Sequence, residues 1–252
     1  MKVNWWEIGN NQNLHLNLND IDLLNKIIIE KYGSLYIISK KLSLGTALYN
    51  KLKYNNQGIT ICLLKKILSE LEISFEKIGK FPIKVGKRKF IETKFPLEIK
   101  PSLGQIFANS IFDGYADKNI MRYSNYDVQL REEFCQCVNS FIENVKIPIN
   151  KPDNFERDID LPSLIPQLLM SVLSVETFLG NKCRIPECFI ELIKKEQKYG
   201  WYFLKGAYLD EGTISSGEVI ILTGIKNKFL VEDTQKIAKM LGLSTKIRTK
   251  KG

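Results

Sequence analysis

Two short segments of the chain resemble each other, and each ends in an acid followed by a glycine. The segments are IFANSIFDG (106–114) and LKGAYLDEG (204–212), and they align when the second is shifted by 98 positions. Asp113 then corresponds to Glu211. Both segments have the apolar spacing of a helix, which places both acids at a helix C-terminus. The helix dipole disfavours negative charge there by roughly 0.3–1 kcal/mol.

Two carboxylates at neighbouring helix ends would repel each other, and a divalent cation between them would remove that conflict. Carboxylate oxygens, together with water and phosphate oxygens, suit Mg²⁺. A metal held in this way can activate water and stabilise the leaving oxygen in phosphodiester hydrolysis. Asp113 and Glu211 are therefore predicted to be catalytic residues and Mg²⁺ ligands. The alternative for either acid alone is an incidental residue at a helix end.

The acids can meet only if the two helices lie side by side. Small residues at corresponding positions, Ala108 and Gly206, would let the backbones approach, and Gly114 and Gly212 would close the helices. Each motif precedes an extended stretch and then an amphipathic helix. These are YADKNIMRYSN and DVQLREEFCQCVNSFIE in the first copy, and TISSGEVIILTG and NKFLVEDTQKIAKMLG in the second. The shared order predicts an internal repeat with a pseudo-twofold axis.

The segment FLKGAYLDEG, with its lead-in RIPECFIELIKKEQKYGWY, resembles the signature of the LAGLIDADG homing endonucleases, and IFANSIFDGY resembles their first motif. The resemblance covers residues 103–252. It implies αββαββα repeats, a monomer that acts as a pseudodimer, and metal-dependent cleavage of both DNA strands across the minor groove. It also implies sheets that read the major groove, with Asp113 and Glu211 as the metal-binding acids.

The chain departs from the family pattern in both motifs. Asn109 and Ser110 stand where the family usually has apolar residues, and Phe112 and Asp210 occupy a position usually held by a small residue. Larger side chains at that position are expected to push the helices apart. The second copy has 40 residues after its motif, against 88 between the two motifs. The second repeat is therefore predicted to be incomplete.

Four short helices are predicted before this region. Residues 19–33, 34–45, 46–58 and 59–74 carry cap residues or terminal glycines around amphipathic runs, with Ile61, Leu64, Leu68 and Leu71 on one face of the fourth. Short helices joined by tight turns are typical of a helix-turn-helix. The segment YIISKKLSLGTALYNKLKYNNQG resembles the Cro/repressor-type family. The alternative is a helical bundle used for protein contacts. The resemblance implies that four residues face the DNA major groove: Thr46, Tyr49, Asn50 and Lys53.

The sequence therefore predicts an α+β protein with a helical helix-turn-helix domain followed by a LAGLIDADG pseudo-repeat domain. The expected divisions are a polar arm or short strand (1–18), the helix-turn-helix domain (19–79), a basic linker (80–102), the first repeat (103–202) and the truncated second repeat (203–252). Alternation in IKVGKRKFIE (83–92) allows a hairpin within the linker.

The formal net charge of +9 over 252 residues indicates attraction to polyanions, of which nucleic acid is the commonest. Basic residues in the linker and in the ending KIRTKK would contact DNA phosphates. The alternatives are a solvated spacer and a frayed tail. The residues concerned are Lys87, Arg88, Lys89, Lys246 and Arg248.

Composition argues against several other classes of protein. A single histidine, His15, and five cysteines without a CxxC pair disfavour a zinc site and a histidine-based triad. An odd number of cysteines favours reduced thiols and a cytoplasmic location. The most apolar segment, residues 161–175, contains two prolines and is too short to span a membrane, so no membrane partner is expected.

The leading interpretation is a metal-dependent, site-specific endonuclease of the homing type. It would be associated with an intron or intein, and it would use Mg²⁺ to cleave double-stranded DNA. The second interpretation is a non-cutting DNA-binding transcriptional regulator with degenerate motifs. The third is an RNA maturase, whose partner would be intron RNA.

Overall fold

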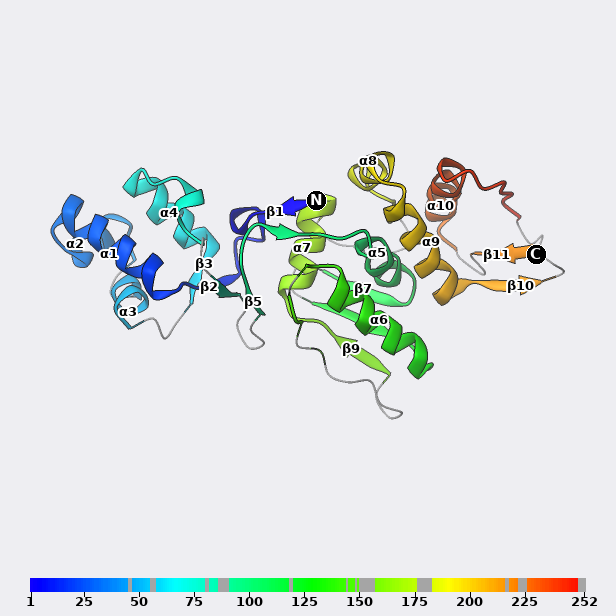
Figure 1. Ribbon diagram of the computed structural model, residues 1–252, viewed down its shortest axis with the longest axis horizontal. Helices are drawn as coiled ribbons and strands as arrows, with labels where there is room; N and C mark the ends of the chain where they lie inside the picture. Colours follow the sequence, from blue (N-terminus) through cyan, green and yellow to red (C-terminus); the bar gives the residue numbers. More distant parts are fainter. Residues whose placement is uncertain are drawn as a thin grey trace. The chain divides into compact units, whose positions relative to one another are not determined.

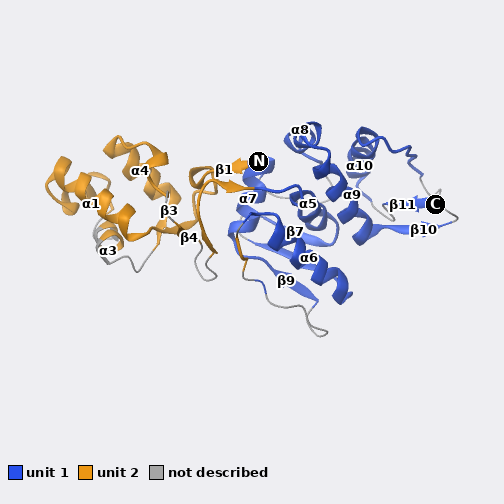
Figure 2. Cartoon of the chain, viewed as in Figure 1, with its two compact units in different colours: residues 1, 99–143, 149–252 blue, residues 2–98, 144–148 orange. Residues whose placement is uncertain are grey.

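The computed structural model describes residues 1–44, 47–54, 58–79, 82–85, 91–117, 120–143, 145–147, 149, 157–175, 183–215, 218–221 and 226–248. The chain is mixed α+β, and it divides into two compact units (Figure 2). The N-terminal unit comprises residues 2–98 and 144–148. The C-terminal unit comprises residue 1, residues 99–143 and residues 149–252.

The predicted helices of the N-terminal unit are present. They are α1 (Leu18–Tyr32), α2 (Leu35–Lys41), α3 (Ala47–Tyr54) and α4 (Ile61–Leu71). The side chains of Asn17 and Ser34 accept backbone N–H groups at the starts of α1 and α2, and Gly33 ends α1 in the left-handed conformation. The predicted apolar face of α4 is confirmed, because all four of its residues are buried.

A small antiparallel sheet completes the N-terminal unit. Its strands lie in the order β3 (Ile59–Thr60), β2 (Asn13–His15), β4 (Ile83–Val85) and β5 (Ile91–Thr93). A second pair joins β1 (Lys2–Val3) to β6 (Leu97–Glu98). The hairpin expected within residues 83–92 is thus present as β4 and β5.

Residues 1–18 contain the short strand that was one of the two expectations for them, whereas residues 80–102 differ from the expected linker. Both segments supply strands to the same unit, and Leu14, Ile83, Val85 and Ile91 are fully buried there. The physical reason is the alternation of apolar residues, which gives each short strand one face to bury. A flexible linker would expose these side chains.

The C-terminal unit contains both copies of the internal repeat (Figure 1). The first copy consists of α5 (Leu103–Phe112), β7 (Gly114–Ala116), β8 (Met121–Ser124), α6 (Val128–Ser140), β9 (Asp158–Asp160) and α7 (Leu164–Leu173). Its described strands form an antiparallel sheet in the order β7-β8-β9. α8 (Glu187–Lys195) leads into the second copy, which consists of α9 (Lys198–Glu211), β10 (Thr213–Ser215), β11 (Glu218–Ile220) and α10 (Lys228–Met240). Each motif helix is therefore followed by a hairpin and a helix, as the repeat predicts.

Helices α5 and α9 pack side by side, and glycines permit their close approach (Figure 1). A Cβ atom on Gly206 would lie 2.8 Å from Cβ of Ala108, which is the crossing that the sequence predicts. Gly104 makes a second close approach, because a Cβ there would lie 2.2 Å from the carbonyl oxygen of Tyr199. The expected spreading by Phe112 and Asp210 is not seen in the helices, which remain packed together.

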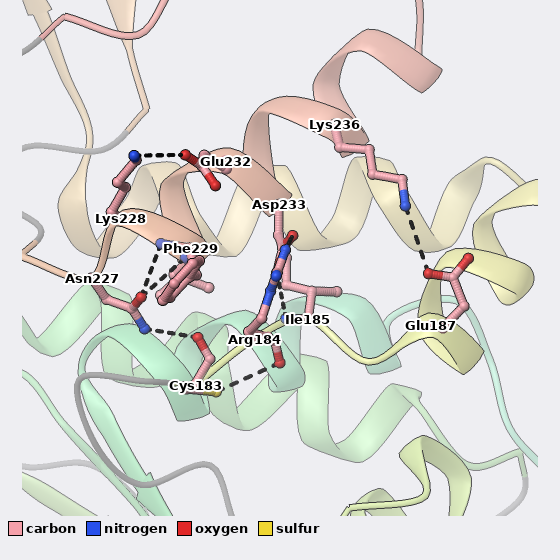
Figure 3. Close-up of polar contacts among 11 residues, drawn as sticks. Cys183, Arg184, Ile185, Glu187, Asn227, Lys228, Phe229, Glu232, Asp233 and Lys236 are labelled. Carbon is pink, nitrogen blue, oxygen red and sulfur yellow. Dashed lines mark hydrogen bonds and ion pairs between the residues drawn. The ribbon is translucent and has the colours of Figure 1, made fainter.

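Helix α10 is fastened to the segment before α8 by a polar network (Figure 3). The Arg184 guanidinium donates to the Asp233 carboxylate at 2.7 and 3.1 Å, and the backbone N–H of Ile185 donates to it at 3.0 Å. Asn227 caps α10 through its Oδ1 atom, and its Nδ2 atom donates to the carbonyl oxygen of Cys183 at 2.7 Å. The Arg184 guanidinium also lies 5.1 Å from the centre of the Phe229 ring. These contacts fix α10 beside the lead-in to α8 and α9.

None of the described helices combines the length and the apolar character that crossing a membrane would require.

Candidate functional site

The two motif acids lie at corresponding helix ends and interact electrostatically. Asp113 is the residue that follows α5, and Glu211 is the last residue of α9. Burial raises the pKa of Glu211, and the negative charge of Asp113 raises this pKa further. Burial also raises the pKa of Asp113. The site thus holds two half-buried carboxyls whose charges repel each other.

Asp210 is a third carboxyl in the same place, and it joins the two repeats. Its Oδ2 atom accepts a hydrogen bond from Asn109 Nδ2, and its Oδ1 atom accepts one from the Tyr123 hydroxyl, both at 2.8 Å. Burial raises the pKa of Asp210 to about 7 against these hydrogen bonds, and the charges of Asp113 and Glu211 also raise it. The interpretation of Asp210 as only a bulky departure at the crossing is incomplete, because both of its oxygens are used to contact the first repeat.

Asp113 is held by a residue just beyond strand β8. Asn125 Nδ2 donates to Asp113 Oδ2 at 3.0 Å, a contact that opposes the burial-driven rise in the Asp113 pKa. Asn125 is itself held through its backbone, since its carbonyl oxygen accepts a hydrogen bond from Arg131 Nη1 at 2.6 Å. Arg131 belongs to α6 and is almost fully buried. The first acid therefore has its own supporting contacts.

Pairing on both sides of strand β8 fixes the direction of its side chains, including that of Tyr123. It pairs with β7 and β9, and its side chains alternate, with Met121 and Tyr123 buried and Arg122 exposed. The Tyr123 ring stacks on Phe134 of α6 at a centroid distance of 4.4 Å. Packing thus fixes the ring and leaves the hydroxyl directed at Asp210.

Each of the two acids is followed by a glycine that lies too close to the preceding helix to carry a side chain. Gly114 and Gly212 do come after the helices, but neither has a positive φ angle, so neither is a left-handed cap. A Cβ on Gly212 would lie 2.2 Å from the carbonyl oxygen of Tyr208. A Cβ on Gly114 would lie 2.6 Å from the carbonyl oxygen of Asn109. Only glycine lets each strand begin directly against the preceding helix.

The carboxyl groups near the two helix ends decide whether this site can hold a magnesium ion. Within the described ranges, no group of three or more His, Cys, Asp or Glu side chains is arranged to hold a metal ion. Asp210 does not add a third ligand to Asp113 and Glu211, because its oxygens face Asn109 and Tyr123. Protein sites for Mg²⁺ commonly use only one or two carboxylates, with water and phosphate oxygens as the other ligands. Asp113 and Glu211 fit that requirement, and a cation between them would relieve the repulsion that raises the Glu211 pKa.

The residues predicted to contact DNA are only partly described. Asn50 is exposed on α3, while the side chains of Tyr49 and Lys53 on the same helix lie outside the described part. Lys246 is exposed, and Arg248 Nη2 lies 2.8 Å from Glu218 Oε2 on β11. The remaining predicted residues lie outside the described ranges: Thr46, Lys87, Arg88 and Lys89.

The positive charge of the chain belongs almost entirely to one unit. The N-terminal unit has 17 basic and 9 acidic residues, a net charge of +8, whereas the C-terminal unit has 20 basic and 19 acidic residues, a net charge of +1. The basic residues predicted to contact DNA lie in both units. The division into units instead concentrates the attraction for polyanions in the N-terminal unit.

No protein-family model matches the chain, and a search of curated proteins finds no similar sequence. The resemblance to the LAGLIDADG family therefore rests on the two motifs.

Proposed function

We propose that the chain is a metal-dependent, site-specific endonuclease that cleaves double-stranded DNA. The observation that carries this proposal is the placement of Asp113 and Glu211 at corresponding ends of α5 and α9, which pack against each other. Two equivalent acids, one from each repeat, suit a reaction performed on two equivalent DNA strands. We propose a cytoplasmic monomer in which the two repeats act as two protomers would.

Asp113 and Glu211 are the residues that would hold Mg²⁺ in this proposal. The bound ion would supply an activated water molecule and stabilisation of the leaving oxygen. Asn125 keeps the Asp113 carboxylate in place, and the packing of α9 on α5 sets the position of Glu211. The substrate would approach as a polyanion drawn by the N-terminal unit, with its net charge of +8.

Cleavage of the DNA that flanks the gene tests this proposal. The full chain should cut that DNA in Mg²⁺, and EDTA should abolish cutting. Asp113→Asn and Glu211→Gln should each reduce cutting at least ~100-fold, because each removes a charge that the metal needs. Glu232→Gln is the matched control, since Glu232 lies on α10, forms an ion pair with Lys228 and is not among the site acids. Equal cutting by all of these variants, or no cutting by the unaltered chain, would refute the endonuclease proposal.

A non-cutting DNA-binding regulator is the second candidate, and the charge distribution favours it. A net charge of +8 on a unit with four short helices would support DNA binding without any metal. This candidate predicts sequence-specific binding in EDTA that is lost when Asn50 and Lys53 are both replaced by alanine. Persistence of specific binding in that double variant would count against it. Preferential binding of structured intron RNA over duplex DNA would instead support the maturase.

A further inference from the structure

We propose that Tyr123 and Asn125 are positioning residues that tie the end of α9 to the end of α5 and thereby fix the separation of Glu211 and Asp113. This inference deepens the endonuclease proposal and rests on it for its functional meaning. All of the contacts that support it lie within the C-terminal unit.

The connection runs through three hydrogen-bonded contacts. The Tyr123 hydroxyl donates to Asp210 Oδ1 at 2.8 Å, and the same hydroxyl accepts from Asn125 Nδ2 at 3.4 Å. Asn125 Nδ2 also donates to Asp113 Oδ2 at 3.0 Å. One short stretch of the first repeat therefore touches an acid from each repeat.

The middle of this connection is rigid. Tyr123 is only 1% exposed, and its ring stacks on Phe134. Its backbone pairs with Gly114 on one side and Ile159 on the other. A side chain held by packing and by two neighbouring strands can act as a fixed reference for the groups that it contacts.

A second side chain of the first repeat, Asn109, also holds Asp210. Asn109 is 2% exposed, and its Nδ2 atom donates to Asp210. No donor within the described ranges reaches the Oδ1 atom of Asn109. A buried acceptor without a partner costs stability. Packing alone would favour an apolar residue at this position, so we infer that Asn109 serves the contact with Asp210.

The position of Asp210 bears directly on Glu211, the next residue in the chain. The last turn of a helix has carbonyl groups without helical partners, and it frays when nothing else holds it. Two hydrogen bonds to Asp210 hold that turn of α9 against the first repeat. Supporting contacts of this kind typically change metal affinity or activity 10–100-fold when they are removed.

Tyr123→Phe tests the inference, because it removes one hydroxyl and keeps the stacked ring. Tyr115→Phe is the matched control: Tyr115 lies on the neighbouring strand β7, is exposed, and donates to Asp117 rather than to the site acids. Two measurements on the full chain are needed. The first is the NMR signal of the Asn125 side-chain amide without metal, and the second is the affinity for Mn²⁺, a paramagnetic substitute for Mg²⁺.

In Tyr123→Phe we expect the two Asn125 amide protons to shift towards the values of a solvated side chain, and the Kd for Mn²⁺ to rise about 10-fold. Tyr115→Phe should change neither. A general loss of stability would lower the melting temperature and leave the Asn125 signals of the folded chain in place, so these signals distinguish positioning from destabilisation.

Unchanged Asn125 signals in Tyr123→Phe would overturn the inference, even if the melting temperature fell. Altered signals with unchanged Mn²⁺ affinity would also overturn it, because the contact would then have no effect on the acids. If the unaltered chain binds no Mn²⁺, the endonuclease proposal fails. The Asn125 amide signals would still show whether Tyr123 fixes Asn125.

Discussion

Tyr123 and Asp210 form a hydrogen bond of 2.8 Å between the two halves of the internal repeat. The bond places a carboxyl from the end of one motif helix against a strand of the other repeat. It occurs beside Asp113, so three carboxyls share a partly buried region. Ionisation of these carboxyls should therefore make the stability of the chain depend on pH.

Asp210 should make the folded chain less stable as the pH rises. Its pKa is raised from 3.8 to about 7 in the folded chain, so the folded state binds the proton more tightly than the unfolded state does. The contribution to stability is fully present below about pH 4 and is lost as the pH rises towards 7. The raised pKa values of Asp113 and Glu211 act in the same direction.

Asp210→Asn removes the largest of these contributions. Relative to the unaltered chain, we expect this variant to gain about 1–3 kcal/mol of unfolding free energy between pH 4 and pH 8. Urea unfolding at the two pH values measures the change. Glu232→Gln on α10 is the control and should follow the unaltered chain. If Asp210→Asn also followed it, Asp210 would not be titrating in this range.

The crossing of α5 and α9 should tolerate no side chain at position 206. A Cβ on Gly206 meets Ala108 Cβ at 2.8 Å and the backbone oxygen of Gln105 at 3.0 Å, so Gly206→Ala should cost about 1–3 kcal/mol. In Gly200→Ala the new methyl meets only side-chain methyl groups of Leu241 and Ile193, at 3.1 and 3.2 Å. That control should be close to neutral in urea unfolding. Equal effects of the two changes would show that helix propensity, rather than the crossing, decides the outcome.

The Arg184–Asp233 pair should contribute more to stability than the exposed pairs of the same helix. Asp233→Ala leaves both the guanidinium and the N–H of Ile185 without their acceptor, and we expect a loss of about 1–3 kcal/mol. Glu232→Ala breaks the Lys228–Glu232 pair, in which the Lys228 side chain is 82% exposed, and should cost less than about 0.5 kcal/mol. Thermal and urea unfolding of the two variants give the comparison. A similar cost for both would mean that α10 is not held by the network of Figure 3.

Nucleic-acid binding should depend on lysines of the N-terminal unit. Lys51 and Lys84 lie on α3 and β4, and changing both to glutamine should lower the affinity for duplex DNA. The plot of log K against log salt concentration should lose up to about 0.9 in slope for each phosphate contact removed. The matched change of Lys228 and Lys239 on α10, in the nearly neutral unit, should leave the slope unaltered. Equal losses in the two double variants would contradict the division of charge between the units.

Local patterns in the sequence were sufficient for the four N-terminal helices and for the crossing of α5 and α9. Caps and apolar spacing act within a few residues, so the four N-terminal helices and the hairpin of residues 83–92 could be predicted. The sequence did not predict that residues 2–98 form one compact unit. Strand β2 pairs with β4 across about 70 intervening positions. Short alternating segments do not reveal such distant partners.

The sequence predicted only those site residues that the alignment of the two repeats makes equivalent. Aligning the two motifs indicates that Asp113 and Glu211 are equivalent, but it assigns no partner to Asp210. Its partners come from α5 and β8, and which side chains reach it depends on the packing of the two repeats. One signal was present in the sequence: Asn109 stands at a position of the motif where an apolar residue is expected. A buried amide of that kind indicates a polar partner across the contact.

The bond between Tyr123 and Asp210 also makes the two halves of the chain complementary rather than interchangeable. In the repeat alignment, Asp210 corresponds to Phe112, and Asn109 corresponds to Ala207. Two copies of the first half would set Phe112 against the amide of Asn109. Two copies of the second half would set Asp210 against Ala207, which offers no donor. Each half therefore discriminates against a second copy of itself.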